Sequence, residues 1–107
     1  MQYQIDYYSE VVRLEVDALP LTLRVRYASL TQRMLEFGPD LGEPHTKALG
    51  AGLLEMRLKG AEGIACVLYC TMAGRRIVVL HSFIKKTDKI PAKDLNLARN
   101  RLKELKK

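Results

Sequence analysis

Basic side chains stand at two places in this chain where a phosphate could bind. One apolar run ends in His81 and is followed by Lys85 and Lys86, and farther upstream Arg57 and Lys59 alternate with apolar residues. Cleavage of RNA without a metal requires a base for the 2′-hydroxyl, cations that stabilise the phosphorane, and an acid or cation at the leaving oxygen. Lysine, histidine and arginine have the side chains for these roles.

The net positive charge is confined to the C-terminal part of the chain. Residues 85–107 contain nine Lys/Arg and three Asp/Glu, whereas residues 1–84 contain nine of each, so the net charge of +6 belongs to the last 23 residues. This asymmetry favours a polyanion or an acidic protein as partner. It does not establish catalysis, because a histidine at a strand end is more often structural and paired lysines are usually a solvated edge.

The length of 107 residues predicts a single domain over residues 1–107, which buries roughly two-thirds of its unfolded surface. No apolar run reaches membrane-spanning length and no signal peptide or lipidation motif is visible, so we expect a cytoplasmic protein. Cys66 and Cys70 lie in one strand-like run about 13 Å apart, too far for a disulfide, which needs α-carbons within about 7 Å. No zinc-binding spacing is present, and we expect no metal and no cofactor.

Hydrophobic periodicity, capping residues and turn residues divide the chain into elements. In order, these are a strand over 2–8, a helix over 10–18 capped by Ser9, a helix opened by Pro20 and ended by Gly38-Pro39, a loop over 39–52, strands over 53–59, 64–71 and 76–84, and a helix opened by Pro91. Short turns predict that the last three strands form an antiparallel meander. The fold class is α+β, with helices packed on one small, mostly antiparallel sheet.

Two helices carry apolar stripes that belong to the core. The stripe of the second helix is Leu19, Leu23, Tyr27, Leu30, Met34 and Phe37, and that of the last helix is Leu95, Ala98, Leu102 and Leu105.

Glu55, Arg57 and Lys59 share one face of their strand, away from the apolar residues between them. They form either a solvated face with ion pairs or, together with His81 and Lys85, a cationic surface that grips a phosphodiester.

Several segments together resemble a known toxin family. The segments are Leu54-Glu55-Met56-Arg57, the strand 63–69, the run 79–87 ending in Lys85-Lys86-Thr87, and Ile90-Pro91 followed by Ala98 and Arg101. Over nearly the whole chain this pattern is similar to the phage-derived HigB-like branch of the RelE/ParE superfamily. The resemblance implies a RelE-like fold, with a strand, two helices, a three-strand meander and a C-terminal helix.

The resemblance also implies an activity and partners. The family's members are toxins of type II toxin–antitoxin pairs. They enter the ribosomal A site and cut mRNA there without a metal, and an antitoxin holds them inactive. For this chain we expect an antitoxin of the helix-turn-helix type. By this resemblance Arg57, Lys59, Lys85 and Lys86 line the scissile phosphate, with His81 nearby. The further candidates for binding RNA are Arg75, Arg76, Lys89, Lys93, Arg99 and Arg101.

One position departs from the family pattern. Cys66 stands where the pattern has arginine, and a neutral thiol cannot make a bidentate phosphate contact. Either this chain is weakened or attenuated, or a lysine, Arg75 or Arg76 takes over the role. The thiol itself is expected to pack as a small apolar residue.

Two other functions remain open from the sequence. Sibling toxins of the same fold inhibit DNA gyrase, as ParE does, and the basic last helix would suffice for a nucleic-acid-binding module without catalysis. Stacking of RNA bases is not expected, because the alternation of its strand predicts that Phe83 lies with Ile77 and Val79 in the core.

Overall fold

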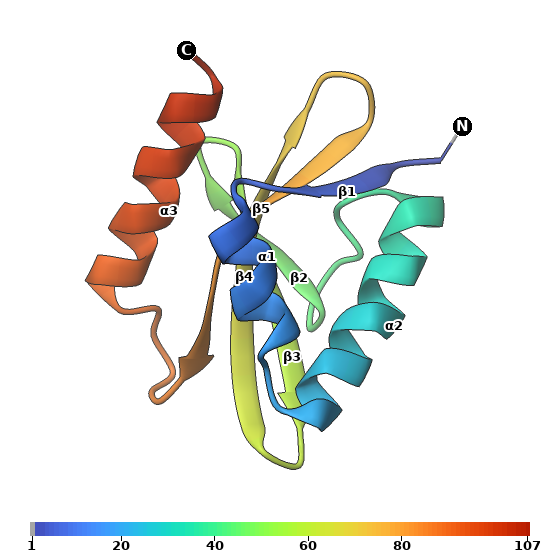
Figure 1. The fold of residues 1–107 in the computed structure, drawn as a ribbon, viewed down its shortest axis with the longest axis vertical. Coiled ribbons are helices and arrows are strands. Elements are labelled where there is room, and N and C mark those ends of the chain that lie inside the picture. Colours follow the sequence, from blue (N-terminus) through green and yellow to red (C-terminus); the bar gives the residue numbers. More distant parts are fainter. Residues whose placement is uncertain (1) are drawn as a thin grey trace.

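The computed structural model describes residues 2–107 as one five-stranded sheet with three helices (Figure 1). The elements are β1 (Gln4–Tyr7), α1 (Glu10–Asp17), α2 (Leu21–Phe37), β2 (Thr46–Gly50), β3 (Leu53–Gly60), β4 (Gly63–Met72), β5 (Arg76–Lys85) and α3 (Ala92–Leu105). The predicted α+β class is confirmed, and the architecture is consistent with a small RelE-like fold.

The strands lie in the order β1-β5-β4-β3-β2. β3, β4 and β5 form the predicted antiparallel meander, while β1 runs parallel to β5 at one edge. The prediction of an irregular loop over 39–52 is wrong for its second half, because β2 pairs antiparallel with β3 at the other edge. An edge strand needs a partner on one side only, so the short, weakly apolar sequence Thr46–Gly50 suffices for it.

Helices cover both faces of the sheet. α1 and α2 pack on one face, and α3 packs on the other (Figure 1). Leu23, Leu30 and Met34 of α2 are buried against Met56 and Tyr69 of the strands. On the opposite face, Ala98 and Leu102 of α3 are buried with residues of the meander, which are Leu53, Leu68, Cys70, Val78 and Leu80. β4 is therefore buried from both sides over most of its length, as its nearly continuous apolar sequence requires.

The helix boundaries follow from local sequence. The Ser9 hydroxyl accepts a hydrogen bond from the Val12 amide at 3.3 Å, and Pro20 and Pro91 directly precede α2 and α3. Gly38 ends α2 with φ at 102°, a conformation open to glycine. One member of the predicted stripe is wrong: Phe37 is 73% exposed, because it is the last residue of α2, where the chain turns away.

A register shift in β5 changes which face its last residues occupy. Tyr69 pairs with Val79, but Leu68 pairs with His81, so Leu80 is an extra residue in β5. Beyond this bulge the alternation is reversed. Phe83 consequently lies on the α3 side of the sheet, partly buried, and not with Ile77 and Val79 as predicted.

No helix within residues 2–107 combines the length and the apolar character that crossing a bilayer requires.

Candidate functional site

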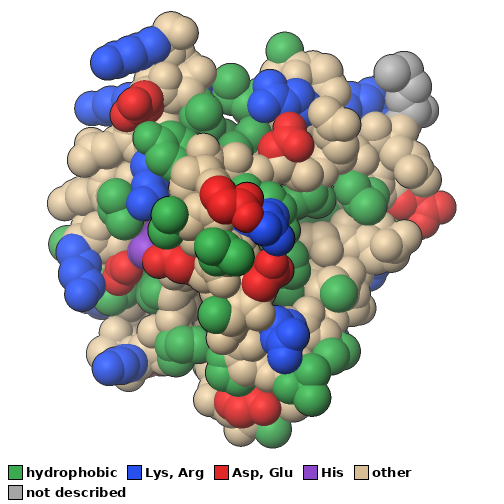
Figure 2. Space-filling model, in the orientation of Figure 1, with side chains coloured by type: hydrophobic (Ala, Val, Ile, Leu, Met, Phe, Trp, Pro, Cys, Tyr) green, Lys and Arg blue, Asp and Glu red, His purple; other side chains and the backbone are tan. Residues whose placement is uncertain are grey.

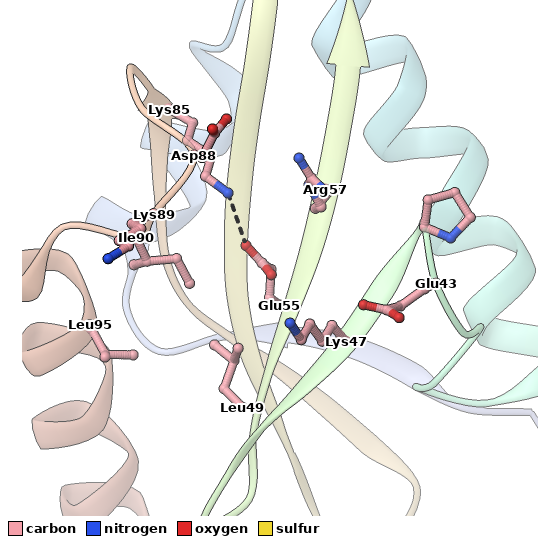
Figure 3. A pocket seen from close by; sticks show the side chains of 11 residues that line it. Glu43, Lys47, Leu49, Glu55, Arg57, Lys85, Asp88, Lys89, Ile90 and Leu95 are labelled. Atoms are coloured by element: carbon pink, nitrogen blue, oxygen red, sulfur yellow. Dashed lines mark ion pairs between the residues drawn. The ribbon is translucent and has the colours of Figure 1, made fainter.

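A cleft of about 360 Å³ opens on the α3 side of the sheet, between β2, β3 and the segment that joins β5 to α3 (Figure 3). It is lined by Glu43, Pro44, Lys47, Leu49, Glu55, Arg57, Lys85, Asp88, Lys89, Ile90 and Leu95. Two smaller hollows adjoin it and share Arg57 with it: one reaches Lys59, and the other reaches Lys86. Arg57 therefore lies where the three hollows meet, and together they form a depression rich in basic side chains.

Strand alternation and register bring these side chains together. Glu55, Arg57 and Lys59 point to the α3 side of β3, and Arg57 lies opposite Cys66 of β4. On β5 the bulge at Leu80 directs Lys85 to the same side. If β5 alternated regularly through Leu80, Lys85 would share the face of Ile77 and Val79, which α1 and α2 cover, so the bulge is a condition for the site.

The sequence left open whether the polar side chains of β3 are solvated. The Glu55 side chain is not, because it is buried. Its carboxylate Oε2 lies 3.8 Å from the Lys85 Nζ, and the two side chains are 6% and 7% exposed. Figure 3 shows the two side chains pointing toward each other across β4. Arg57 and Lys59, farther toward the strand end, are exposed. The cleft thus holds one buried ion pair beside one exposed guanidinium.

Cys66 contributes to the same cluster. Its thiol is fully buried and donates a hydrogen bond from Sγ to the Glu55 Oε2 at 2.8 Å. Burial, and then the bond to Glu55, raise the pKa of the Cys66 thiol from 9.0 to about 12. The side chain is therefore a neutral thiol at physiological pH and not a nucleophile. It is buried as predicted, but as the hydrogen-bond partner of a carboxylate.

His81 lies outside the cleft lining. Its Nε2 is 2.7 Å from the Asp94 Oδ1 in the first turn of α3, and its ring stacks on Phe83 with centroids 5.6 Å apart. Both members of the His81–Asp94 pair are buried. This arrangement attaches α3 to the sheet and keeps the imidazole away from Arg57.

Arg75 and Arg76 lie at the opposite end of the sheet. Lys85 lies nine positions after Arg76 along β5, which is about 30 Å of strand. Arg76 is paired with Asp6 at 2.8 Å, and Arg75 lies over the Tyr3 ring. Neither can take the place of an arginine at position 66.

The basic residues of α3 have different surroundings. Arg99 donates hydrogen bonds to the carbonyls of Leu49 and Gly50, and Arg101 donates one to the Leu80 carbonyl. Lys93 is exposed, whereas Lys89, just before the helix, lines the cleft. Figure 2 shows blue side chains along α3 and the segment before it, in agreement with the charge asymmetry of the sequence.

Glu43 and Lys47 enter the cleft from the segment around β2 and were not identified from the sequence (Figure 3). No pattern in the sequence pointed to either of them. Glu55 was placed on the face of Arg57 by strand alternation, but its contact with Lys85 was not predicted. Within residues 2–107 no group of three or more His, Cys, Asp or Glu side chains is placed to hold a metal ion.

The profile of the family described as phage-derived protein Gp49-like (DUF891) matches residues 14–103. The chain belongs to this Gp49-like family. The family is associated with the RelE/HigB-like toxins of toxin–antitoxin systems. No curated protein matches the sequence significantly. The matched part of this Gp49-like protein includes every residue that lines the cleft.

Proposed function

We propose that this Gp49-like protein is the toxin of a type II toxin–antitoxin pair, of the HigB-like branch of the RelE/ParE superfamily. In this proposal it acts in the cytoplasm, enters the ribosomal A site and cuts mRNA there, and a helix-turn-helix antitoxin neutralises it. The observation that carries the proposal is the depression around Arg57, where basic side chains from four parts of the chain meet. They are Lys47, Lys59, Lys85, Lys86 and Lys89.

Arg57 is the residue best placed to hold the reacting phosphate. Its guanidinium is exposed at the junction of the three hollows, and a guanidinium can bind two phosphate oxygens at once. Such a contact strengthens as negative charge grows on the phosphorane, which lowers the barrier to cleavage. Lys59 and Lys86 lie in the flanking hollows, where neighbouring phosphates of the same strand would pass.

The size of the cleft supports a nucleotide-sized occupant. Its volume of about 360 Å³ falls at the lower end of the range of roughly 300–1,000 Å³ that is typical of small-molecule sites. Asp88 and Glu43 at the rim repel additional phosphates, so the cations are interrupted and do not form an even basic surface. This pattern favours a site that accepts a particular stretch of RNA over one that binds any polyanion.

The decisive experiment maps mRNA 5′ ends by primer extension in a cell-free translation reaction. The reactions contain the wild-type chain, Cys66→Arg or Arg57→Ala, with a parallel reaction that lacks ribosomes. The proposal predicts cuts within translated codons that require ribosomes, increase with Cys66→Arg and disappear with Arg57→Ala. Intact mRNA with both the wild type and Cys66→Arg contradicts it. DNA breaks that require gyrase would instead identify a ParE-like inhibitor, and RNA binding without products a non-catalytic module.

A further inference from the structure

Lys85 differs from the other cations of the cleft because a carboxylate lies against it. Its Nζ is 3.8 Å from the Glu55 Oε2, and its side chain is only 7% exposed. Among the ion pairs of the described residues, neither Lys85 nor Glu55 takes part in any other. Arg57, in contrast, is exposed and takes part in none of them. The positive charge of Lys85 is therefore offset, while that of Arg57 is available.

The second partner of Glu55 brings no charge. The Cys66 thiol donates one hydrogen bond to the carboxylate, and burial raises its pKa so that it remains protonated. A thiol is a weak donor compared with an ammonium or guanidinium group. Lys47 stands opposite Glu55 in the register of β2 and β3, but it is exposed, and Lys85 is the only cation of the described residues within ion-pair distance of the buried carboxylate.

This pairing opposes movement of Lys85 toward a substrate. When one member of a buried ion pair leaves, the other remains as an uncompensated charge in a poorly solvated place, which is strongly unfavourable. A phosphate in the cleft must therefore compete with Glu55 for Lys85. Arg57 and Lys86 face no such competitor, since neither has an ion-pair partner among the described residues.

We infer that Glu55 restrains Lys85, and that the residue at position 66 sets the strength of this restraint. With a neutral thiol at position 66, Lys85 stays on Glu55 and adds little to the binding of an RNA phosphodiester. Removing the carboxylate charge, or giving Glu55 another cation, releases Lys85 into the cleft. Glu55 is thus a positioning residue that acts through Lys85. The inference rests on the proposed function, in which this cleft receives the phosphates of RNA.

The test measures, by fluorescence anisotropy, how tightly the protein binds a fluorescein-labelled 2′-O-methyl oligouridylate of ten nucleotides. The KCl concentration is varied between 50 and 200 mM, because the affinity of phosphate contacts depends steeply on salt in this range. The methylated probe cannot be cleaved through its 2′-oxygen, and no ribosome is present. In Glu55→Gln the amide oxygen can still accept the thiol hydrogen while the charge is gone. We expect about fivefold tighter binding at low salt. The slope of log affinity against log salt should steepen by about 0.7, the value for one further phosphate contact of a single strand.

Glu43→Gln is the matched control. Glu43 lines the same cleft and the substitution removes the same charge, but Glu43 is exposed and takes no part in the contact with Lys85. We expect less than a twofold change in affinity and no change in slope. The double variant Glu55→Gln, Lys85→Met should lose the whole gain of Glu55→Gln, since that gain is assigned to Lys85.

A second variant provides an independent reading. Cys66→Arg leaves the carboxylate charged but supplies it with a guanidinium, so Lys85 should again become free. Acylation of Lys85 by a water-soluble amine reagent, followed by peptide mass spectrometry, measures this directly. The exposed Lys93 of α3, which does not line the cleft, is the internal reference. In Cys66→Arg and Glu55→Gln we expect Lys85 to react at least fivefold faster than in the wild type.

Several results overturn the inference. They are unchanged or weaker binding by Glu55→Gln, an equal gain in Glu43→Gln, a gain that persists without Lys85, unchanged reactivity of Lys85, or no binding by any variant at low salt. Failure of the proposed function is recognised separately. The wild type and Cys66→Arg would then give no ribosome-dependent cuts, whatever the oligonucleotide experiment shows.

Discussion

The His81 Nε2 and the Asp94 Oδ1 lie 2.7 Å apart in a buried pair that joins the middle of β5 to the first turn of α3. The carboxylate stands at the helix N-terminus, where the helix dipole favours a negative group. This contact fixes the start of α3 and with it Ile90 and Leu95, which form one wall of the cleft. The histidine that the sequence offered as a catalytic candidate thus has a structural position.

We expect Asp94→Ala to lower the free energy of unfolding by about 1–3 kcal/mol, because the buried His81 nitrogen loses its partner. Urea denaturation followed by circular dichroism measures this change. Asp88→Ala removes an exposed carboxylate six residues earlier and should change stability by no more than about 0.5 kcal/mol. Equal effects of the two substitutions would contradict the structural role of the pair.

Arg57→Ala should abolish cleavage with little effect on folding. Loss of a group that stabilises transition-state charge typically lowers the rate by about 10²–10³. Because Arg57 is exposed, its removal should change stability by no more than about 0.5 kcal/mol. Arg33→Ala, which removes an exposed arginine from α2, is the control and should leave the rate of ribosome-dependent cleavage unchanged. A similar loss in both variants would argue against a local role for Arg57.

Lys85→Met should be strongly destabilising, because the buried Glu55 then loses its ion-pair partner. Removal of one partner from a buried ion pair costs about 3–5 kcal/mol. The double variant Glu55→Gln, Lys85→Met removes both charges and should recover most of this loss. Denaturant titrations of the four proteins form a double-mutant cycle, and additive effects would show that the two side chains do not interact.

Alkaline pH should destabilise the protein through Cys66. Its pKa is about 12 in the folded chain, raised mainly by burial from 9.0, so the folded state holds the thiol proton more tightly than the unfolded state does. This contribution is complete below about pH 9 and is lost as pH rises toward 12. Between pH 8 and 10.5 we expect Cys66→Val to lose about 1–2 kcal/mol less stability than the wild type. Parallel pH profiles for the two proteins would contradict the assignment.

Local patterns in the sequence determined much of the framework. The predicted caps and breakers at Ser9, Pro20, Gly38 and Pro91 all stand at helix ends in the structure. The alternation over 53–59 also placed Arg57 and Lys59 on one face correctly, and the basic C-terminal part follows from composition alone. These features depend on residues within one helical turn or one strand, so their cause is visible in the sequence.

Tertiary structure decided what these residues contact. Glu55 and Lys85 are 30 positions apart, and their contact depends on the register of three strands and on the bulge at Leu80. The same bulge turned Phe83 to the α3 side, against the alternation of its sequence. His81 met Asp94 because α3 packs on that face. A polar side chain pairs with whichever partner the packed chain brings within a few ångströms, and its own neighbours in sequence do not specify that partner.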